Sequence, residues 1–356
     1  MARVRQKAVI DLSLCKTPSR KYHDTSIPMY EGSKVRKIGV LTSGGDAPGM
    51  NACIRAVVRT AVQRGIDVVG IQQGYSGLLS GEFAKLNRRT VANIIQRGGT
   101  ILESSRCEEM KTAEGRRQGI QMAQQEGIEG LVVIGGDGTF RGAAAIAEES
   151  QIKLIGIPAT IDNDIYGTDY AIGFDTAINT ALEAIDRIRD TADAFQRIFF
   201  VEVMGRSSGF IALEVGVAGG AEEIIIPEKE TDLEELCHTL KESFRRGKRS
   251  SIIVVAEGNE VGHTVQIAQY VQYRLKASCR VCILGHLQRG GAPTARDRVL
   301  ASKLGIAAVD GLLNGKEGHA VGEKKGEITY TPFRETWERK KELDTYFLES
   351  SKVLAM

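Results

Sequence analysis

The chain has 356 residues, of which 42% are hydrophobic, and its 47 basic and 45 acidic side chains leave a formal net charge of +2. So small a net charge excludes a global field that would select DNA, RNA or a membrane surface, so any anion must be held by local clusters. The length exceeds what one hydrophobic core usually supports, and no interdomain linker is apparent. We therefore expect two closely packed domains that bind neither nucleic acid nor membrane.

The sequence carries no pattern for membrane insertion or export, because no segment is long and apolar enough and the N-terminus lacks an apolar core followed by small residues. The six cysteines are scattered, at Cys15, Cys53, Cys107, Cys237, Cys279 and Cys282. Cys279 and Cys282 lack the second pair that a zinc site needs. Reduced thiols and a cytoplasmic protein are expected. Residues 1–35 are basic and without periodicity, which predicts a flexible N-terminal extension.

Short aliphatic and β-branched runs alternate with longer amphipathic stretches along the rest of the chain. The runs are 38–42, 67–71, 131–135, 153–157, 197–203, 223–227, 251–256 and 280–285. They are too continuously hydrophobic for half-exposed antiparallel strands, so we expect parallel strands buried on both faces. The alternation of strand and helix predicts an α/β fold of two doubly wound, three-layer domains with mainly parallel sheets.

Polar, glycine-rich segments follow five of these predicted strands. They are SGGDAPGMN (43–51), GGDGT (135–139), PATIDND (158–164), MGRSSG (204–209) and GHLQRGG (285–291). Ligands of doubly wound sheets bind outside the carboxyl ends of the strands, where loops and helix N-termini meet. We therefore expect all five segments to line one active-site cleft between the two domains.

Gly44 and Gly45 lie between the first predicted strand and a helix predicted to begin near Met50. Bare backbone amides at a helix N-terminus can face phosphate oxygens. A tight turn without any ligand explains this pair of glycines equally well. Neither a Walker A lysine loop nor a complete GxGxxG motif is present, which disfavours P-loop NTPases and ordinary dinucleotide-binding proteins.

Asp137 stands among glycines at the end of another predicted strand. A lone carboxylate there suits a magnesium ion that is held mostly by water and nucleotide phosphates. An ordinary Asp-Gly turn is the alternative. Any side chain in place of Gly138 would intrude on space in which a nucleotide could lie.

The segment 160–164 supplies one hydroxyl and two carboxylates. Phosphoryl transfer to an alcohol needs a base oriented on the hydroxyl and positive charge on the migrating group. Asp162 is the predicted base, and Asp164 would support it or contact the metal through water. Arg106 and Arg206 would supply the charge, because a guanidinium braces phosphate bidentately. An Asx-rich capping turn explains single residues of this set but not all of them.

Arg280, His286 and Arg289 form a second cationic group around the last predicted strand and its exit loop. They lie far in sequence from the nucleotide loops, which predicts a separate pocket for the phosphate of a second substrate. A lone histidine would more often be structural, but the two arginines favour binding.

The ordered set SGGDAPGMN, GGDGT, TIDND, MGR, AEG and GHLQRGG resembles 6-phosphofructokinases over about residues 36–315. GGDG alone also occurs in NAD kinases and lipid kinases, whereas the ordered set is specific. The resemblance implies a glycolytic enzyme that uses ATP and Mg²⁺. It would transfer the γ-phosphoryl group of ATP to the 1-hydroxyl of fructose 6-phosphate, giving fructose 1,6-bisphosphate and ADP.

Two alternatives within the family remain. Pyrophosphate-dependent members resemble GGDD with a lysine before TIDND, and Gly138 and Ala159 stand at those positions here, which favours ATP. A catalytically silent regulatory paralogue is disfavoured because Asp137, Asp162 and Arg206 are intact.

The resemblance also implies site residues. The catalytic set would be Asp162, Thr160, Arg206 and Asp164. ATP would lie against Gly44, Gly45, Tyr75, Arg106, Cys107, Gly136, Asp137, Gly138 and Thr139, with Asp137 as the magnesium ligand. Fructose 6-phosphate would contact Thr160, Ile161, Asp162, Arg197, Met204, Gly205, Arg206, Glu257, Arg280, His286, Leu287, Gln288 and Arg289. Arg197 would reach in from a neighbouring subunit of a homotetramer.

The resemblance further implies a nucleotide-binding domain of residues 36–173 with about 288–339, and a sugar-phosphate-binding domain of 174–287 with about 340–356. An effector site for a nucleoside diphosphate or phosphoenolpyruvate would use Arg55, Arg59, Arg88, Arg189, Glu222, Arg246 and Lys248. Asn93 stands where the bacterial pattern tends to have Asp, and SSGFIAL resembles other branches of the family. The response to effectors is therefore expected to differ or to be lost.

Overall fold

The computed structural model describes residues 35–195, 197–258 and 262–354, all within the compact unit Ser33–Met356. The predicted N-terminal extension and Cys15 fall outside the described residues, apart from residue 35 at the end of that extension. The described cysteines Cys53, Cys107, Cys237, Cys279 and Cys282 are free. Among the described residues, none of the helices combines the length and hydropathy that crossing a membrane requires.

The first sheet has seven strands in the order β11-β10-β5-β4-β1-β2-β3. Its strands are β1 (Lys37–Ser43), β2 (Asp67–Ile71), β3 (Phe83–Leu86), β4 (Gly130–Gly135), β5 (Lys153–Pro158), β10 (His319–Lys324) and β11 (Glu327–Pro332). The central strands are parallel, and β3 and β11 pair antiparallel with β2 and β10 at the two edges.

The second sheet has four strands in the order β7-β8-β6-β9, and all its pairings are parallel. The strands are β6 (Ile198–Val203), β7 (Glu223–Ile225), β8 (Ser251–Ala256) and β9 (Cys279–Ile283). All eight strands predicted from apolar runs are therefore present and lie in parallel ladders. Strands β3, β10 and β11 were not predicted, because their short, half-exposed segments lack a continuous apolar run.

Helices connect the strands in both sheets. They are α1 (Met50–Gln63), α2 (Gly74–Ser80), α3 (Ala113–Gln125), α4 (Asp137–Glu149), α5 (Phe174–Phe195), α6 (Phe210–Ala218), α7 (Leu233–Arg245), α8 (His263–Leu275), α9 (Ala295–Leu313), α10 (Glu335–Glu338) and α11 (Thr345–Leu354), with the 3₁₀ turns η2 (Glu109–Lys111) and η3 (Gly285–Arg289). The helix predicted near Met50 begins at that residue.

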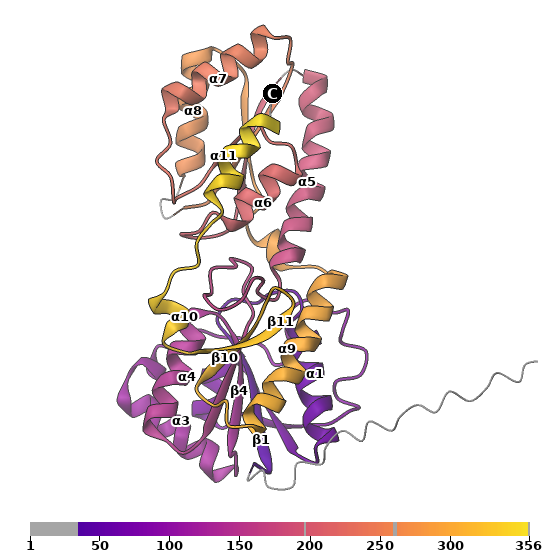
Figure 1. Cartoon of the computed structure of the whole chain (residues 1–356), viewed down its shortest axis with the longest axis vertical. Coiled ribbons are helices and arrows are strands. Elements are labelled where there is room, and N and C mark those ends of the chain that lie inside the picture. Colours follow the sequence, from indigo (N-terminus) through magenta and orange to yellow (C-terminus); the bar gives the residue numbers. More distant parts are fainter. Residues whose placement is uncertain (1–34, 196, 259–261, 355–356) are drawn as a thin grey trace, which may run out of the picture. The chain divides into compact units, whose positions relative to one another are not determined.

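Both faces of the first sheet are buried, as the continuous apolar runs predicted. On β4, Val132 and Ile134 belong to one core cluster, while Leu131 and Val133 belong to another. Helices α9 and α4 pack against β4 from the two sides (Figure 1). Successive side chains of a strand point to opposite faces, so this alternation defines helix, sheet and helix layers.

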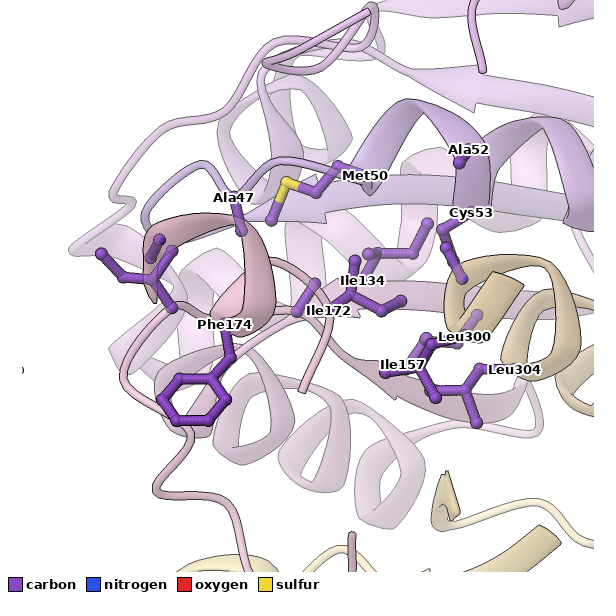
Figure 2. Packing of buried hydrophobic residues seen from close by; sticks show 14 of the residues in the cluster. Ala47, Met50, Ala52, Cys53, Ile134, Ile157, Ile172, Phe174, Leu300 and Leu304 are labelled. Atoms are coloured by element: carbon purple, nitrogen blue, oxygen red, sulfur yellow. The ribbon is translucent and has the colours of Figure 1, made fainter. Parts of the chain in front are cut away.

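Helices α1 and α9 lie side by side along the seven-stranded sheet (Figure 1). Figure 2 shows Cys53 of α1 close to Leu300 and Leu304 of α9, above Ile157. A Cβ on Gly305 would lie 2.7 Å from the Cβ of Ala56, so only glycine permits this close approach of the two helices.

The predicted domain boundaries stay a prediction. Strands of the seven-stranded sheet fall within 36–173 and 288–339, and those of the four-stranded sheet within 174–287. This distribution is compatible with the division proposed from the sequence.

Candidate active site

The carboxyl ends of β1, β4 and β5 border a cavity of about 720 Å³. All nine residues predicted to surround ATP line it, namely Gly44, Gly45, Tyr75, Arg106, Cys107, Gly136, Asp137, Gly138 and Thr139. The four residues predicted to be catalytic, Thr160, Asp162, Asp164 and Arg206, line the same cavity. The structure thus brings together segments that the sequence separates by more than a hundred residues.

An adjoining cavity of about 540 Å³ shares Gly44, Gly45, Arg106, Arg206 and Arg289 with the first. Of the residues predicted to hold fructose 6-phosphate, Met204, Arg206, Glu257, His286 and Arg289 line it. These residues follow β6, β8 and β9 of the four-stranded sheet. The two cavities together form one site at the carboxyl ends of strands from both sheets, where ligands of such folds bind.

Several residues predicted for the sugar-phosphate pocket line neither cavity. Ile161 is fully buried in the core, and the side chain of Leu287 is 70% exposed. Gln288 is also fully buried, where its Oε1 accepts the amide of Met204 at 2.8 Å and its Nε2 donates to Ala177 O at 3.3 Å. Gln288 therefore supports the turn that begins at Met204.

Arg197 and Arg280 lie at the opposite, amino-terminal end of the four-stranded sheet. Arg197 directly precedes β6, and Arg280 pairs with Phe199 at the start of β9. Strand β6 has six residues, so Arg197 is about 20 Å from the carboxyl end of its own strand. A single chain therefore does not gather Arg280 with His286 and Arg289, contrary to the predicted cationic group.

The glycine-rich loop after β1 has conformations that glycine favours. Gly44 has φ of 88° and Gly49, which precedes α1, has φ of 109°. A Cβ on Gly45 would lie 2.5 Å from Nη1 of Arg289, which donates to Asp46 O at 3.1 Å. The bare backbone at Gly45 thus admits a guanidinium that borders both cavities.

Strand β4 leads directly into α4, which begins at Asp137. A Cβ on Gly138 would meet no atom within 4 Å, so this position opens into the cavity, as predicted. Tyr75 Oη donates to Thr139 O at 2.6 Å, and Thr139 Oγ1 donates to Ser43 O at 3.0 Å. These bonds fix the start of α4 against α2 and the end of β1.

Asp162 is a buried carboxyl, with 6% of its surface exposed. Among the described residues, its Oδ1 has no hydrogen-bond partner. Burial, aided by the negative charge of Asp164, raises the pKa of Asp162 to about 6, although Arg289 and Arg206 lower it. A carboxylate with a free oxygen and a pKa near neutrality is suited to accept a proton from a bound substrate.

The carboxylates of Asp137 and Asp164 are the metal-binding candidates of the larger cavity. Burial raises the pKa of Asp164, and the negative charge of Asp137 adds to this rise. A divalent cation would relieve that repulsion, and hard oxygen donors are the ligands that Mg²⁺ prefers. No cluster of three or more potential metal ligands occurs among the described residues, so water and phosphate oxygens would have to complete the coordination.

The cavity also has basic residues that the sequence did not single out. Lys111, Arg116 and Arg141 line it, and Arg141 Nε donates to Asp137 Oδ1 at 2.9 Å. Arg141 follows Asp137 by four residues, a spacing that places both on one face of α4. This spacing of four residues could have predicted from the sequence that Arg141 lies beside Asp137.

The predicted effector residues lie on several elements. Arg55 and Arg59 are on α1, where burial and the charge of Arg59 lower the pKa of Arg55. Arg189 donates to Gly219 O and Gly220 O, and Lys248 pairs with the buried Glu222 at 2.9 Å. Arg88 and Arg246 are exposed. The effector site stays a prediction.

A doubly wound fold in which glycine-rich loops and guanidinium groups surround a buried carboxylate is typical of enzymes that transfer phosphoryl groups. The family model for phosphofructokinase matches residues 37–312 of this chain. The chain belongs to the phosphofructokinase family.

Curated relatives support this membership. The ATP-dependent 6-phosphofructokinase 1 of Thermus thermophilus is 56% identical over 322 residues, which cover 90% of this chain and 100% of that protein. The ATP-dependent 6-phosphofructokinase of Shouchella clausii is 51% identical over 322 residues, with the same coverage of both chains.

Solved structures share the fold. A phosphofructokinase from Saccharomyces cerevisiae superposes with a TM-score of 0.81 at 34% identity, over 90% of this chain and 48% of the yeast chain. This chain thus spans about half the length of the yeast protein. A pyrophosphate-dependent phosphofructokinase from Marinobacter aquaeolei has a TM-score of 0.78 at 22% identity, over 89% of this chain and 91% of that one, and shows likeness of fold alone.

Proposed function

We propose that this chain is an ATP-dependent 6-phosphofructokinase that phosphorylates the 1-hydroxyl of fructose 6-phosphate, with fructose 1,6-bisphosphate and ADP as products. Relatives that carry this name are 51–56% identical over 90% of the chain. The observation that carries the proposal is Asp162, a buried carboxyl with a free oxygen, in the cavity that also contains Asp137 and Arg206.

In this proposal ATP occupies the larger cavity and the sugar phosphate the smaller one. Asp162 takes the proton of the sugar 1-hydroxyl while the hydroxyl oxygen attacks the γ-phosphorus of ATP. The bond between the γ-phosphorus and the β,γ-bridging oxygen then breaks, and ADP leaves. Arg206, which lines both cavities, and Thr160 hold the migrating group. Transfer is direct, without a phosphoenzyme, because the donor and acceptor sites adjoin.

Magnesium would be held by Asp137, with Asp164 as a second contact through water. When bound, the ion would neutralise charge on the donor phosphates. Arg106 lies in both cavities and would add positive charge from the protein side. Tyr75 and Cys107 would lie against the nucleotide.

Arg197 and Arg280 are proposed to act in a neighbouring subunit. Both lie at the amino-terminal end of the four-stranded sheet, away from the cavities of their own chain. A homotetramer in which this end faces the smaller cavity of another subunit would supply both guanidinium groups to the substrate's 6-phosphate. The cytoplasmic location remains part of the same proposal.

The deciding experiment compares donors. Purified protein with fructose 6-phosphate and Mg²⁺ is expected to form fructose 1,6-bisphosphate with ATP and not with pyrophosphate. Gly138 and Ala159 are the reason for this expectation, since their small size leaves room for a nucleotide. Turnover with pyrophosphate alone would assign the other donor, and binding of fructose 6-phosphate without turnover would indicate a regulatory subunit.

A further inference from the structure

The turn after β6 has a backbone conformation that needs support. Gly205 has φ of 144°, and a Cβ there would lie 2.5 Å from Ser208 O, so no other residue fits. Arg206 follows with φ of 52°, in the left-handed region that non-glycine residues rarely adopt. Such a conformation persists only where the surroundings hold it.

Three residues hold this turn. Gln288 Oε1 accepts the amide of Met204 at 2.8 Å, and Glu257 Oε1 accepts the amide of Arg206 at 3.0 Å. The amide of Ser208 donates to Gly205 O at 2.9 Å. The backbone is therefore held by hydrogen bonds before Arg206, at Arg206 itself and after it.

The hydroxyl of Ser208 makes a further connection. Its side chain is buried, with 6% exposed, and Oγ lies 2.9 Å from Gly205 O and 3.2 Å from Asp162 O. A serine hydroxyl has one proton, so the two carbonyl oxygens share it. Asp162 follows β5 and Ser208 follows β6, so this hydroxyl joins a loop of the seven-stranded sheet to a loop of the four-stranded sheet.

We propose that Ser208 is a positioning residue that sets the distance between Asp162 and Arg206. The inference rests on the proposed function, in which these two residues are the base and a phosphoryl ligand. Ser208 lines neither cavity, so it acts through the backbone of both loops rather than on a substrate. Displacement of a reacting group by about 1 Å can lower a rate by about 10²-fold, so a single bond at this point matters.

The test uses Ser208→Ala, Ser208→Cys and the control Ser207→Ala, whose side chain is exposed beside it. We expect Ser208→Ala to lower kcat by about 10- to 100-fold with little change in the KM of ATP or fructose 6-phosphate. Cysteine fills the site but is a weak donor, so Ser208→Cys should recover little of that loss. Ser207→Ala should match the wild type.

The split between kcat and KM provides a second readout. A looser turn should lower the kcat of folded Ser208→Ala while both KM values stay near those of the wild type. A merely structural role would change thermal stability without lowering the kcat of the folded protein. Full activity of Ser208→Cys, or a kcat of Ser208→Ala within twofold of wild type, would overturn the inference. Should Ser208→Ala fail to fold, Ser208→Cys alone decides between these outcomes.

The two proposals fail differently. If the wild-type protein does not phosphorylate fructose 6-phosphate, the proposed function is wrong. If the wild type is active and the Ser208 variants equal it in kcat, only the positioning role is wrong.

Discussion

The protonation state of one carboxyl, Asp162, governs the proposed reaction at the scale of single residues. Its burial, and the absence of a hydrogen-bond partner for Oδ1 among the described residues, leave that oxygen for a substrate. The nearby arginines keep the group ionised near neutral pH despite its burial. Arg206 and Arg289 thus lower the pKa of the predicted base and also supply positive charge to the active site.

Asp162→Asn should lower kcat by about 10²- to 10⁴-fold, because amide nitrogen and oxygen cannot accept the proton. The KM for fructose 6-phosphate should change much less, since the substituted group acts mainly in the transition state. Steady-state kinetics with ATP check this, with the exposed Asp67→Asn as a control. Near-normal turnover would remove Asp162 from its assigned role.

The pH dependence follows from the same carboxyl. Its pKa is raised to about 6, so the ionised base exists above that pH, and kcat/KM should fall as the pH decreases through about 6. The negative charge of Asp164 contributes to the rise, so Asp164→Asn should move the acid limb to lower pH. A shift of that limb to higher pH in the variant would contradict the electrostatic account.

At the scale of elements, the N-termini of helices α5 and α9 contact each other. Asp297 of α9 is buried, and its carboxylate accepts the amides of Gly173 and Thr176 at 2.9 and 2.8 Å and the hydroxyl of Thr176 at 2.5 Å. It thereby caps α5 from another helix. Helix α9 follows the turn η3 with His286 and Arg289, so the cap connects the sugar-phosphate loop to α5.

Asp297→Ala should lower the free energy of unfolding by about 3 kcal/mol, because three buried donors lose a charged acceptor. The matched control is Asp232→Ala at the exposed N-cap of α7, where Asp232 accepts two amides and the expected loss is about 1 kcal/mol. Urea denaturation of both variants measures the difference. Equal losses of unfolding free energy would mean that the buried cap stabilises the protein no more than the exposed one.

At the scale of the whole molecule, the proposed homotetramer would share residues between the active sites of its subunits. Arg197 and Arg280 lie at the end of the four-stranded sheet that is remote from their own cavities. Arg197→Ala and Arg280→Ala should therefore each raise the KM for fructose 6-phosphate by about 10-fold or more, as expected for loss of a charged contact with phosphate.

Mixing subunits tests the sharing directly. Asp162→Asn subunits lack the base but keep Arg197, and Arg197→Ala subunits have the opposite pattern. Co-expressed hybrids should recover low-KM activity, because some sites combine an intact Asp162 with a neighbour's Arg197. If Arg197 acts within its own subunit, the mixture should keep the high KM of the Arg197→Ala protein.

The sequence by itself determined the strands and the loops of the site. The continuous apolar runs predicted β1, β2 and β4 to β9, because burial on both faces of a parallel sheet leaves a local signature. Gly44, Asp137 and Asp162 could be placed at the ends of those strands, and they do line one cavity. Glycines and carboxylates that follow a predicted strand could therefore be identified as candidate site residues from the sequence.

Only the tertiary structure decided which distant residues meet. It put Arg280 at the far end of β9, buried Gln288 against Met204, and brought the hydroxyl of Ser208 to Asp162 O. Strand order and register set these relations, and they depend on packing between segments remote in sequence. The residues that neighbour Ser208 or Gln288 in the sequence do not indicate which distant group each side chain contacts. The contacts of these two side chains could therefore not be predicted from the sequence.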